Sequence, residues 1–311
     1  MEKENVFIYM QECIEKKRKT GKDSTADLYR ATCNHLMEFR ENQQMQWKEV
    51  TEDFVDRFHA HLKNLGLKPN SINSYLSNFR AMYNDAVKNG LTSPSPNPFT
   101  HLKLKREETE KRALPKSIIQ KIAQTDAGSS ALQRLAVDCF IFSYLACGMP
   151  FVDLANLTNE NIHGDRIVYR RIKTGTKVSI GITPGMRLLL KRYRRKGALR
   201  LFPLLPDVKV VSHETYKRCL RKINECLKEL GEKLDLPDKL TFYVARHSWA
   251  SNAQEEDVPT AAISQSMGHA SEKTTLLYLA GLSQKKLNRE NRKVTKEVDS
   301  IVCRYNVYLI S

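Results

Sequence analysis

Apolar residues recur at intervals of three and four through the first ninety positions, and this helical periodicity constrains the fold more than any other feature. Phe7, Met10 and Ile14 form one such series. Thr51 is a favourable N-terminal cap for a later series, and Gly66 is a typical C-terminal stop. The pattern predicts four helices, over 6–18, from 24 onward, over 51–66 and over 69–90. Four helices with short connections make a compact all-α domain of roughly a hundred residues.

The pattern changes beyond this domain. Residues 93–98 are rich in proline and serine, and residues 99–113 are strongly charged and poorly periodic, which is typical of a linker. Helical patterns then return at 129–144, 151–157, 186–196, 212–230, 248–254 and 260–268. One segment alternates instead: Ile167 to Lys173 and Val178 to Ile182 predict the arms of a β-hairpin, with the turn at Thr174 to Lys177.

We therefore expect a mainly α protein with a small β-hairpin. Its expected parts are a helical domain over 1–98, a basic linker over 99–113, an α+β domain over 114–296 and a tail over 297–311. The tail carries apolar residues from Ile301 to Ile310 and is too short to fold alone. Two placements stay open for it: against a neighbouring protomer, or back against its own domain.

Charge and composition narrow the class of protein. The formal net charge is +16 and the isoelectric point is about 9.5, which favours a polyanionic partner such as nucleic acid over a merely basic protein. No apolar run of about 18 residues occurs and the N-terminus is charged, so we expect neither a membrane span nor an export signal, and a cytoplasmic location. Seven scattered cysteines without a Cys-x-x-Cys pair argue against a disulfide framework or a zinc ribbon.

Two segments near the end of the chain propose one reactive site. Tyr243, Arg246 and His247 lie in the first segment, and His269 lies nine positions before Tyr278 in the second. We expect Arg246 to precede a helix that starts at Ser248, and Tyr278 to lie about a turn into a helix. An arginine can hold two phosphate oxygens at once. A phenol has a pKa near 10 and becomes nucleophilic only when cations crowd around it.

Basic and polar residues elsewhere predict contacts with the same polyanion. Residues two apart on a strand share a face, so Arg171 and Lys173 would point one way and Arg170 the other. Further candidates for DNA contact are Asn73 and Arg80 on the predicted fourth helix, and Lys103 and Lys105 in the linker. Taken singly, each of these residues also fits an ordinary solvated surface.

In this order the blocks resemble the tyrosine recombinase/integrase family over nearly the whole chain. The resemblance rests on the family's hairpin lysine at Lys173-Thr174-Gly175, its second-arginine block at Arg246-His247, its third-box histidine at Gly268-His269 and its nucleophile at Tyr278. Two positions depart from the family pattern: Pro150 stands where the first-box arginine is usual, and Tyr243 stands where a histidine is usual. Asp153 falls at the family's acidic position, and this variant of the first box resembles integrases and invertases of a Bacteroidetes-type subgroup.

The resemblance implies an all-α SAM-like core-binding domain followed by an α+β catalytic domain. It implies that Tyr278 attacks a phosphodiester of double-stranded DNA, that Lys173 protonates the leaving oxygen, and that His247 and His269 serve as base or hydrogen-bond donors. We hypothesise that Arg171 replaces the missing arginine and that Tyr243 donates to the same phosphate. No metal or other cofactor is required, and the expected assembly is a homotetramer on synapsed DNA and a monomer when free.

Three alternatives stay open at this point. The first is a non-catalytic DNA-binding protein of the same ancestry, disabled by Pro150. The second is an enzyme like type IB topoisomerases, which relaxes supercoiled DNA without a target sequence. The third is a helical interaction module. These residues do not distinguish between integration, excision, inversion and dimer resolution.

Overall fold

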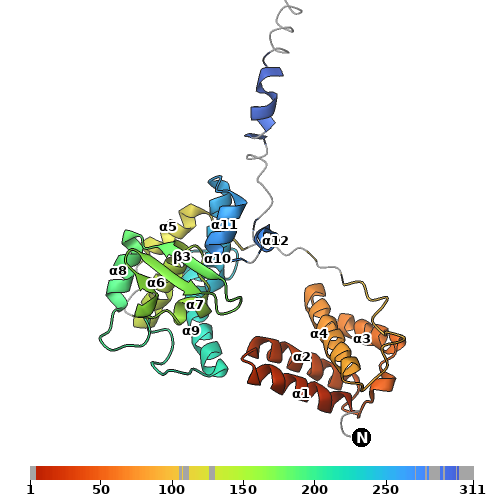
Figure 1. The fold of residues 1–311 in the computed structure, drawn as a ribbon. Helices are drawn as coiled ribbons and strands as arrows, with labels where there is room; N and C mark the ends of the chain where they lie inside the picture. Colours follow the sequence, from red (N-terminus) through yellow and green to blue (C-terminus); the bar gives the residue numbers. More distant parts are fainter. Residues whose placement is uncertain are drawn as a thin grey trace, which may run out of the picture. The chain divides into compact units, whose positions relative to one another are not determined.

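The computed structural model describes residues 5–104, 107, 112–125, 130–269, 271–276, 279, 288–289, 291–298 and 300. The chain divides into two compact units, Met1–Thr109 and Glu110–Ser311 (Figure 1). Each unit has its own cluster of buried apolar side chains, and each is described here by itself. The described parts are mostly helical with one small sheet, as the periodicity predicts.

The N-terminal unit consists of four α-helices and a short 3-10 helix: α1 (Val6–Lys19), α2 (Asp23–Phe39), η2 (Trp47–Glu49), α3 (Glu52–Asn64) and α4 (Pro69–Lys88). Local chemistry sets the ends of α3 and α4. The Thr51 side chain accepts from the amide of Phe54 at 3.2 Å, and Pro69 occupies the first turn of α4, where its missing N–H costs nothing. All four helices predicted for this region are therefore present.

Aromatic side chains form much of the core of the N-terminal unit. Trp47 contacts Tyr9 and Tyr83 with ring centroids 5.7 and 6.0 Å apart, and Phe79 contacts Phe58 and Phe99 at 6.0 and 5.3 Å. These pairs join η2 to α1 and to α4, and α4 to α3 and to Phe99. Edge-to-face contacts of this kind add to the stabilisation from burial.

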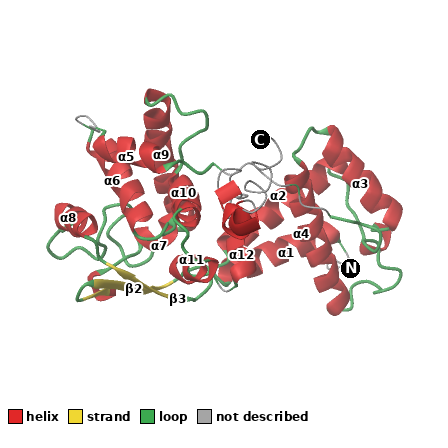
Figure 2. Ribbon diagram, turned by 90° about the horizontal axis from the view of Figure 1, so that it is seen from above, coloured by secondary structure: helices red, strands yellow, loops and turns green. Residues whose placement is uncertain are grey.

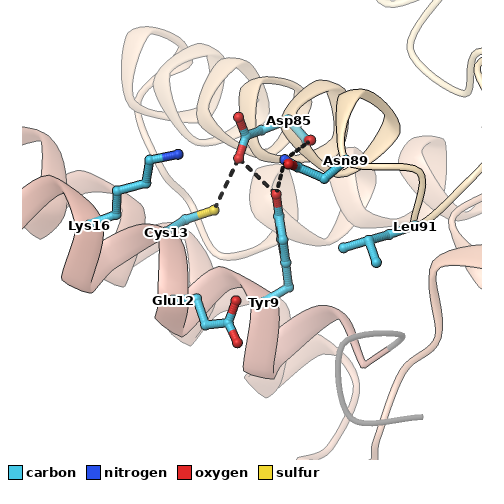
Figure 3. Close-up of a pocket in the computed structure, with 7 residues that line it drawn as sticks. All are labelled: Tyr9, Glu12, Cys13, Lys16, Asp85, Asn89 and Leu91. Atoms are coloured by element: carbon cyan, nitrogen blue, oxygen red, sulfur yellow. Dashed lines mark hydrogen bonds between the residues drawn. The ribbon is translucent and has the colours of Figure 1, made fainter.

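A polar pocket of about 270 Å³ lies between α1 and α4 (Figure 3). The Tyr9 hydroxyl donates to Oδ2 of Asp85 at 2.8 Å and accepts from the Asn89 amide at 2.8 Å. Cys13 lies beside the same carboxylate oxygen at 3.8 Å, and burial raises the pKa of its thiol to about 11. This thiol is therefore protonated at neutral pH.

The C-terminal unit surrounds the long apolar helix α6. Its elements are α5 (Lys116–Gln124), α6 (Ala131–Leu145), α7 (Phe151–Ala155), η3 (Asn159–Asn161), β1 (Ile162–His163), β2 (Arg166–Arg170), β3 (Lys177–Gly181), α8 (Pro184–Tyr193), α9 (His213–Lys233), α10 (Phe242–Glu255), α11 (Thr260–Met267) and α12 (Glu272–Leu276). Helix α6 packs against α5, α8, α9 and α10. The strands form an antiparallel sheet in the order β1-β2-β3, and Figure 2 shows it at one edge of the unit, with α11 against β3.

The structure corrects two sequence-based boundaries. The first hairpin arm ends at Arg170 rather than Lys173, because the Arg171 amide donates to Thr176 and the Gly175 amide donates back to Arg171, which closes a turn. Arg171 and Lys173 therefore do not share a strand face, and that premise was wrong. Helix α10 begins at Phe242, before Arg246, and not at Ser248.

The early start of α10 has a long-range cause. The Phe242 amide donates to the side-chain oxygen of Asn224, which lies on α9, at 2.8 Å. A first-turn amide of α10 is thus satisfied by another helix, and periodicity within one segment cannot reveal such a partner. The strand β1 was also not predicted, since it has only two residues.

The sequence also led to expectations about membrane spans and about the C-terminal tail. Within the described residues, no helix is both long and apolar enough to cross a membrane. The apolar tail from Ile301 to Ile310 lies outside the described residues, so both placements considered for it stay predictions.

Candidate functional site

Arg246 is the centre of the site and is only 2 % exposed. It lies in the second turn of α10, where its guanidinium donates to the carbonyl oxygens of Gly148 and Met267, each at 2.8 Å. The same guanidinium meets Nε2 of His269 at 2.8 Å. A buried guanidinium held by three fixed acceptors has one orientation, which is what binding a phosphate in a set position requires.

The turn after α6 exists in its observed form because residue 148 is glycine. Gly148 has a φ of +69°, and a Cβ at this position would lie 2.7 Å from the Cα of Arg246. The backbone of the first-box segment thus comes into direct contact with α10. This close approach also brings the Gly148 carbonyl to the Arg246 guanidinium.

Arg171 is a second buried cation at the same place. It is 7 % exposed, and its guanidinium donates to the carbonyl of Met267, the oxygen that Arg246 also binds. Its Nε lies 2.7 Å from Oδ2 of Asp153, which is 3 % exposed. Within the described part of the chain these two atoms form an ion pair without an aligned hydrogen bond.

Asp153 also fixes the turn that follows Arg171. Its other oxygen, Oδ1, accepts the backbone amide of Ile172 at 2.9 Å. Burial raises the pKa of this carboxyl, and the Ile172 amide and the Arg171 guanidinium act in the opposite direction. One carboxylate on α7 thus holds both the side chain of Arg171 and the backbone that leads to Lys173.

The end of α11 joins these groups. Gly268 ends the helix in the left-handed conformation with a φ of +66°, and a Cβ there would lie 2.5 Å from Cγ2 of Val178. The glycine therefore lets α11 approach β3 closely. As a result, the Met267 carbonyl, which lies in the last turn of the helix and is not needed for the helix's own hydrogen bonds, reaches both arginines.

His269 follows this glycine, and both nitrogens of its ring form hydrogen bonds with described residues. Nε2 meets the Arg246 guanidinium at 2.8 Å, and Nδ1 meets the hydroxyl of Thr275 at 2.8 Å. Burial and the neighbouring Arg246 and Arg171 lower the pKa of His269 to about 4. The imidazole is therefore neutral at physiological pH.

His247 and Tyr243 lie on α10 beside Arg246. The His247 ring is partly buried and packs edge-on against Tyr243, with centroids 4.9 Å apart. Tyr243 is 45 % exposed, so its side chain is accessible to solvent. Their spacing of four residues brings Tyr243 and His247 together on one side of α10.

The basic residues of the hairpin differ in their exposure to solvent. Arg170 is exposed at the end of β2 and donates to the Gly175 carbonyl at 3.2 Å, whereas Arg171 is buried. Lys173 is exposed in the turn. Lys173 follows Arg171 by two residues, and the backbone amide between them, that of Ile172, is held by Asp153.

The candidate nucleophile Tyr278 lies outside the described residues, and so does Lys105. The described residue nearest before Tyr278 is Leu276, at the end of α12. The remaining candidates for DNA contact belong to the N-terminal unit. Asn73 and Arg80 are partly buried on α4, and Lys103 is exposed.

Sequence reasoning missed several groups that build the site. Asp153 was noted only by its position, and neither the Met267 carbonyl nor Thr275 was singled out. Thr275 is fully buried on α12. A buried hydroxyl normally has a hydrogen-bond partner, which here is His269. Among the residues that the structure describes, no three His, Cys, Asp or Glu side chains gather in a way that could hold a metal ion.

Known proteins resemble this chain in sequence and in fold. Residues 5–104 match the phage integrase SAM-like domain, and residues 112–285 match the phage integrase family. The integrase of Escherichia phage P2 is 22 % identical over 231 residues, which cover 74 % of this chain and 61 % of that protein. Tyrosine recombinase XerC of Pseudomonas fluorescens is 24 % identical over 272 residues, covering 82 % of this chain and 84 % of that protein.

Solved structures agree on the fold. The Tn1549 transposon integrase in complex with transposon right end DNA has a TM-score of 0.67 at 16 % identity, covering 94 % of this chain and 99 % of that chain. A lambda integrase tetramer bound to a Holliday junction has a TM-score of 0.64 at 16 % identity, covering 89 % and 77 %. With a match that alone spans residues 112–285, more than half of its length, the chain belongs to the phage integrase family, whose relatives named here include tyrosine recombinases.

Proposed function

We propose that this protein is a site-specific DNA recombinase that cleaves and rejoins DNA through a 3′-phosphotyrosine intermediate. The observation that carries the proposal is the convergence of two buried guanidiniums, Arg246 and Arg171, on the end of α11 beside His269. Two fixed cations at one place suit a phosphate whose negative charge grows in the transition state. The family relatives named as tyrosine recombinases support the same reaction.

The proposed first step is an attack of the Tyr278 hydroxyl on phosphorus. A histidine, His247 or His269, accepts the phenol proton or donates a hydrogen bond. Arg246 and Arg171 neutralise the pentacoordinate phosphorane, and Tyr243 donates to the same phosphate. The bond from phosphorus to the 5′ oxygen then breaks, and Lys173 gives that oxygen its proton. The phosphotyrosyl bond keeps the energy of the broken ester, so rejoining needs no ATP.

Arg171 takes the place of the arginine that Pro150 replaces in the first box. Three features support this proposal: the burial of Arg171, its bond to the acceptor that Arg246 also uses, and its ion pair with Asp153. The segment around Pro150 still contributes to the site, since the Gly148 carbonyl binds Arg246 and Asp153 binds Arg171. The first box has thus lost its own arginine and retained a carbonyl and a carboxylate that position two others.

The proposed partner is double-stranded DNA, with the N-terminal unit as a core-type DNA-binding domain. Asn73 and Arg80 on α4, together with Lys103, Lys105 and Arg170, are the proposed contacts. Solved neighbours include integrases bound to DNA as dimers and as a tetramer. We propose the same for this chain, with a homotetramer on two synapsed sites and a monomer in the absence of DNA. Its place of action is then the nucleoid in the bacterial cytoplasm.

The test is a nicked suicide substrate, on which cleavage releases a short fragment and traps the covalent complex. Fragments of the DNA that flanks the gene itself, scanned for inverted repeats, serve as substrates. The wild-type chain should give a protein–DNA adduct that resists boiling in detergent, and Tyr278→Phe should give none. Specific binding without any adduct would leave a non-catalytic DNA-binding protein instead. Relaxation of a plasmid that lacks the target would indicate an enzyme like type IB topoisomerases.

A further inference from the structure

The ring of His269 lies between two partners whose chemistry settles where its proton is. An arginine guanidinium has only donors, so Nε2 of His269 must accept in its 2.8 Å contact with Arg246. The neutral ring then carries its proton on Nδ1, which donates to the Thr275 hydroxyl at 2.8 Å. The three side chains form one directed series of hydrogen bonds, in which Arg246 donates to His269 and His269 donates to Thr275.

Thr275 is unusually well placed for this purpose. It is fully buried on α12, while its neighbour Thr274 is only partly buried and points its hydroxyl toward Ser271 at 3.3 Å. Thr275 is also three positions before Tyr278 in the sequence. The segment that leads to the proposed nucleophile is therefore joined directly to the ring that contacts the phosphate-binding arginine.

We propose that Thr275 is a positioning residue, whose hydroxyl holds His269 in the Nδ1–H tautomer so that Nε2 accepts from Arg246 and orients its guanidinium toward the DNA phosphate. His269 then acts as a neutral acceptor rather than as a cation. The charges that face the ring agree with this role. Arg246 and Arg171 both lie near it and disfavour a third positive charge. The effect on catalysis rests on the proposed function, whereas the tautomer does not.

The tautomer can be measured without DNA. The chain has eight histidines, so selective ¹⁵N-histidine labelling gives a small set of ring signals, and His269→Gln identifies the one that belongs to residue 269. In the wild type, Nδ1 of His269 should show a protonated nitrogen and Nε2 an unprotonated one. An Nε2–H tautomer in the wild type would overturn the proposal.

The hydroxyl itself is tested by a matched set of variants. Thr275→Val keeps the shape and removes the hydroxyl, Thr275→Ser keeps the hydroxyl, and Thr274→Val makes the same change at the neighbouring residue. We expect Thr275→Val to lose the single Nδ1–H tautomer and to form the covalent complex about tenfold more slowly, the effect of one lost hydrogen bond in the transition state. Thr275→Ser and Thr274→Val should stay close to the wild type in both measurements.

The measurements separate this proposal from the proposed function. Wild-type tautomer and rate in Thr275→Val, with an unchanged melting temperature, would overturn the role of Thr275. Equal losses in Thr275→Val and Thr274→Val would also overturn it, since they would indicate a general effect on α12. If the wild type gives no covalent complex on any substrate, the proposed function fails, and the ring signals still decide the tautomer.

Discussion

The two units of this chain differ in the kind of polar group that they bury. In the N-terminal unit, Tyr9, Asp85 and Asn89 form a hydrogen-bonded group between α1 and α4, while the candidate DNA contacts on α4 lie at its partly exposed positions. In the C-terminal unit, two arginines are themselves buried and held by carbonyls and a carboxylate.

The contrast follows from what each unit is proposed to do. Contacts along a DNA groove must reach a surface, and each contributes a modest, salt-dependent amount. A group that stabilises a transition state must hold one direction before the substrate arrives, which burial and fixed acceptors ensure. The comparison therefore predicts large effects on cleavage from the C-terminal unit, and small effects on stability or binding from the N-terminal unit.

The largest effect is expected at the buried arginines. Arg246→Ala and Arg171→Lys should each slow covalent complex formation by roughly 10²–10³-fold, because each removes a donor aimed at developing charge. Arg170→Ala, at the neighbouring exposed position, is the control. At saturating DNA it should keep a nearly normal rate, because a lost DNA contact lowers the affinity and not the rate of the bound complex. Lysine rather than alanine is chosen at residue 171 because Asp153 would otherwise be buried without a counter-charge. Similar rates for the changes at 170 and 171 would remove Arg171 from the site.

A slightly smaller effect is expected at the joint between α11 and β3. Gly268→Ala should lower the free energy of unfolding by about 2–4 kcal/mol, since the new Cβ would meet Val178 and the backbone conformation disfavours a side chain. Gly197→Ala has a similar φ of +77° but open space around the new Cβ. This substitution should therefore lower the free energy of unfolding only by the cost of placing a side chain on a left-handed backbone. Chemical denaturation of both variants measures the difference, and equal losses would argue against a tight contact at Gly268.

The N-terminal polar group should matter less. Tyr9→Phe removes the donor to Asp85 and should lower the free energy of unfolding by about 1–2 kcal/mol. The rate of covalent complex formation at saturating DNA should stay unchanged, because the residue belongs to the other unit. A cleavage defect with normal folding would show that the separation between the two units is too simple.

Binding provides a comparably modest test. Arg80→Ala should reduce the salt dependence of DNA affinity by about one unit of slope, as expected when one phosphate contact is lost. Lys88→Ala, an exposed lysine at the end of the same helix, is the control. Titrations at several salt concentrations give the slopes, and identical slopes for the two variants would count against α4 as the groove-facing helix.

The smallest expected effect concerns pH. The pKa of His269 is lowered to about 4 in the folded chain, against an ordinary value near 6.5. Between these values the unfolded chain binds more protons, so stability falls as the pH drops from about 6.5 to about 4. His269→Gln should lose less stability than the wild type over that range. Parallel unfolding curves at pH 7 and pH 5 test this, and equal losses would contradict a neutral, partly buried ring.

The fold was largely predictable because its cause is local. Periodic apolar residues and caps such as Thr51 specify each helix from its own sequence. The errors occur where a distant group satisfies the backbone. Asn224 on α9 begins α10 earlier than its own pattern suggests, and Asp153 on α7 helps to end the first hairpin arm.

The candidate site was harder to predict for a related reason. Spacing and resemblance pointed to Arg246, His269 and Arg171, and the structure brings these three together. No sequence pattern marks a backbone carbonyl as a shared acceptor, and none links Thr275 to the ring of His269. The role of Tyr278 stays a prediction, because that residue lies outside the described part of the chain.

The carbonyl at the end of α11 has a consequence for how such enzymes change over time. It accepts from guanidiniums on two separate segments. On the role proposed for Arg171, a mutation that removes an arginine from one segment is therefore offset by an arginine on another. A search that demands arginine at position 150 would discard this chain as inactive. A search for two basic side chains within reach of that carbonyl would retain this chain. It would also retain distant relatives in which the second arginine lies on yet another segment.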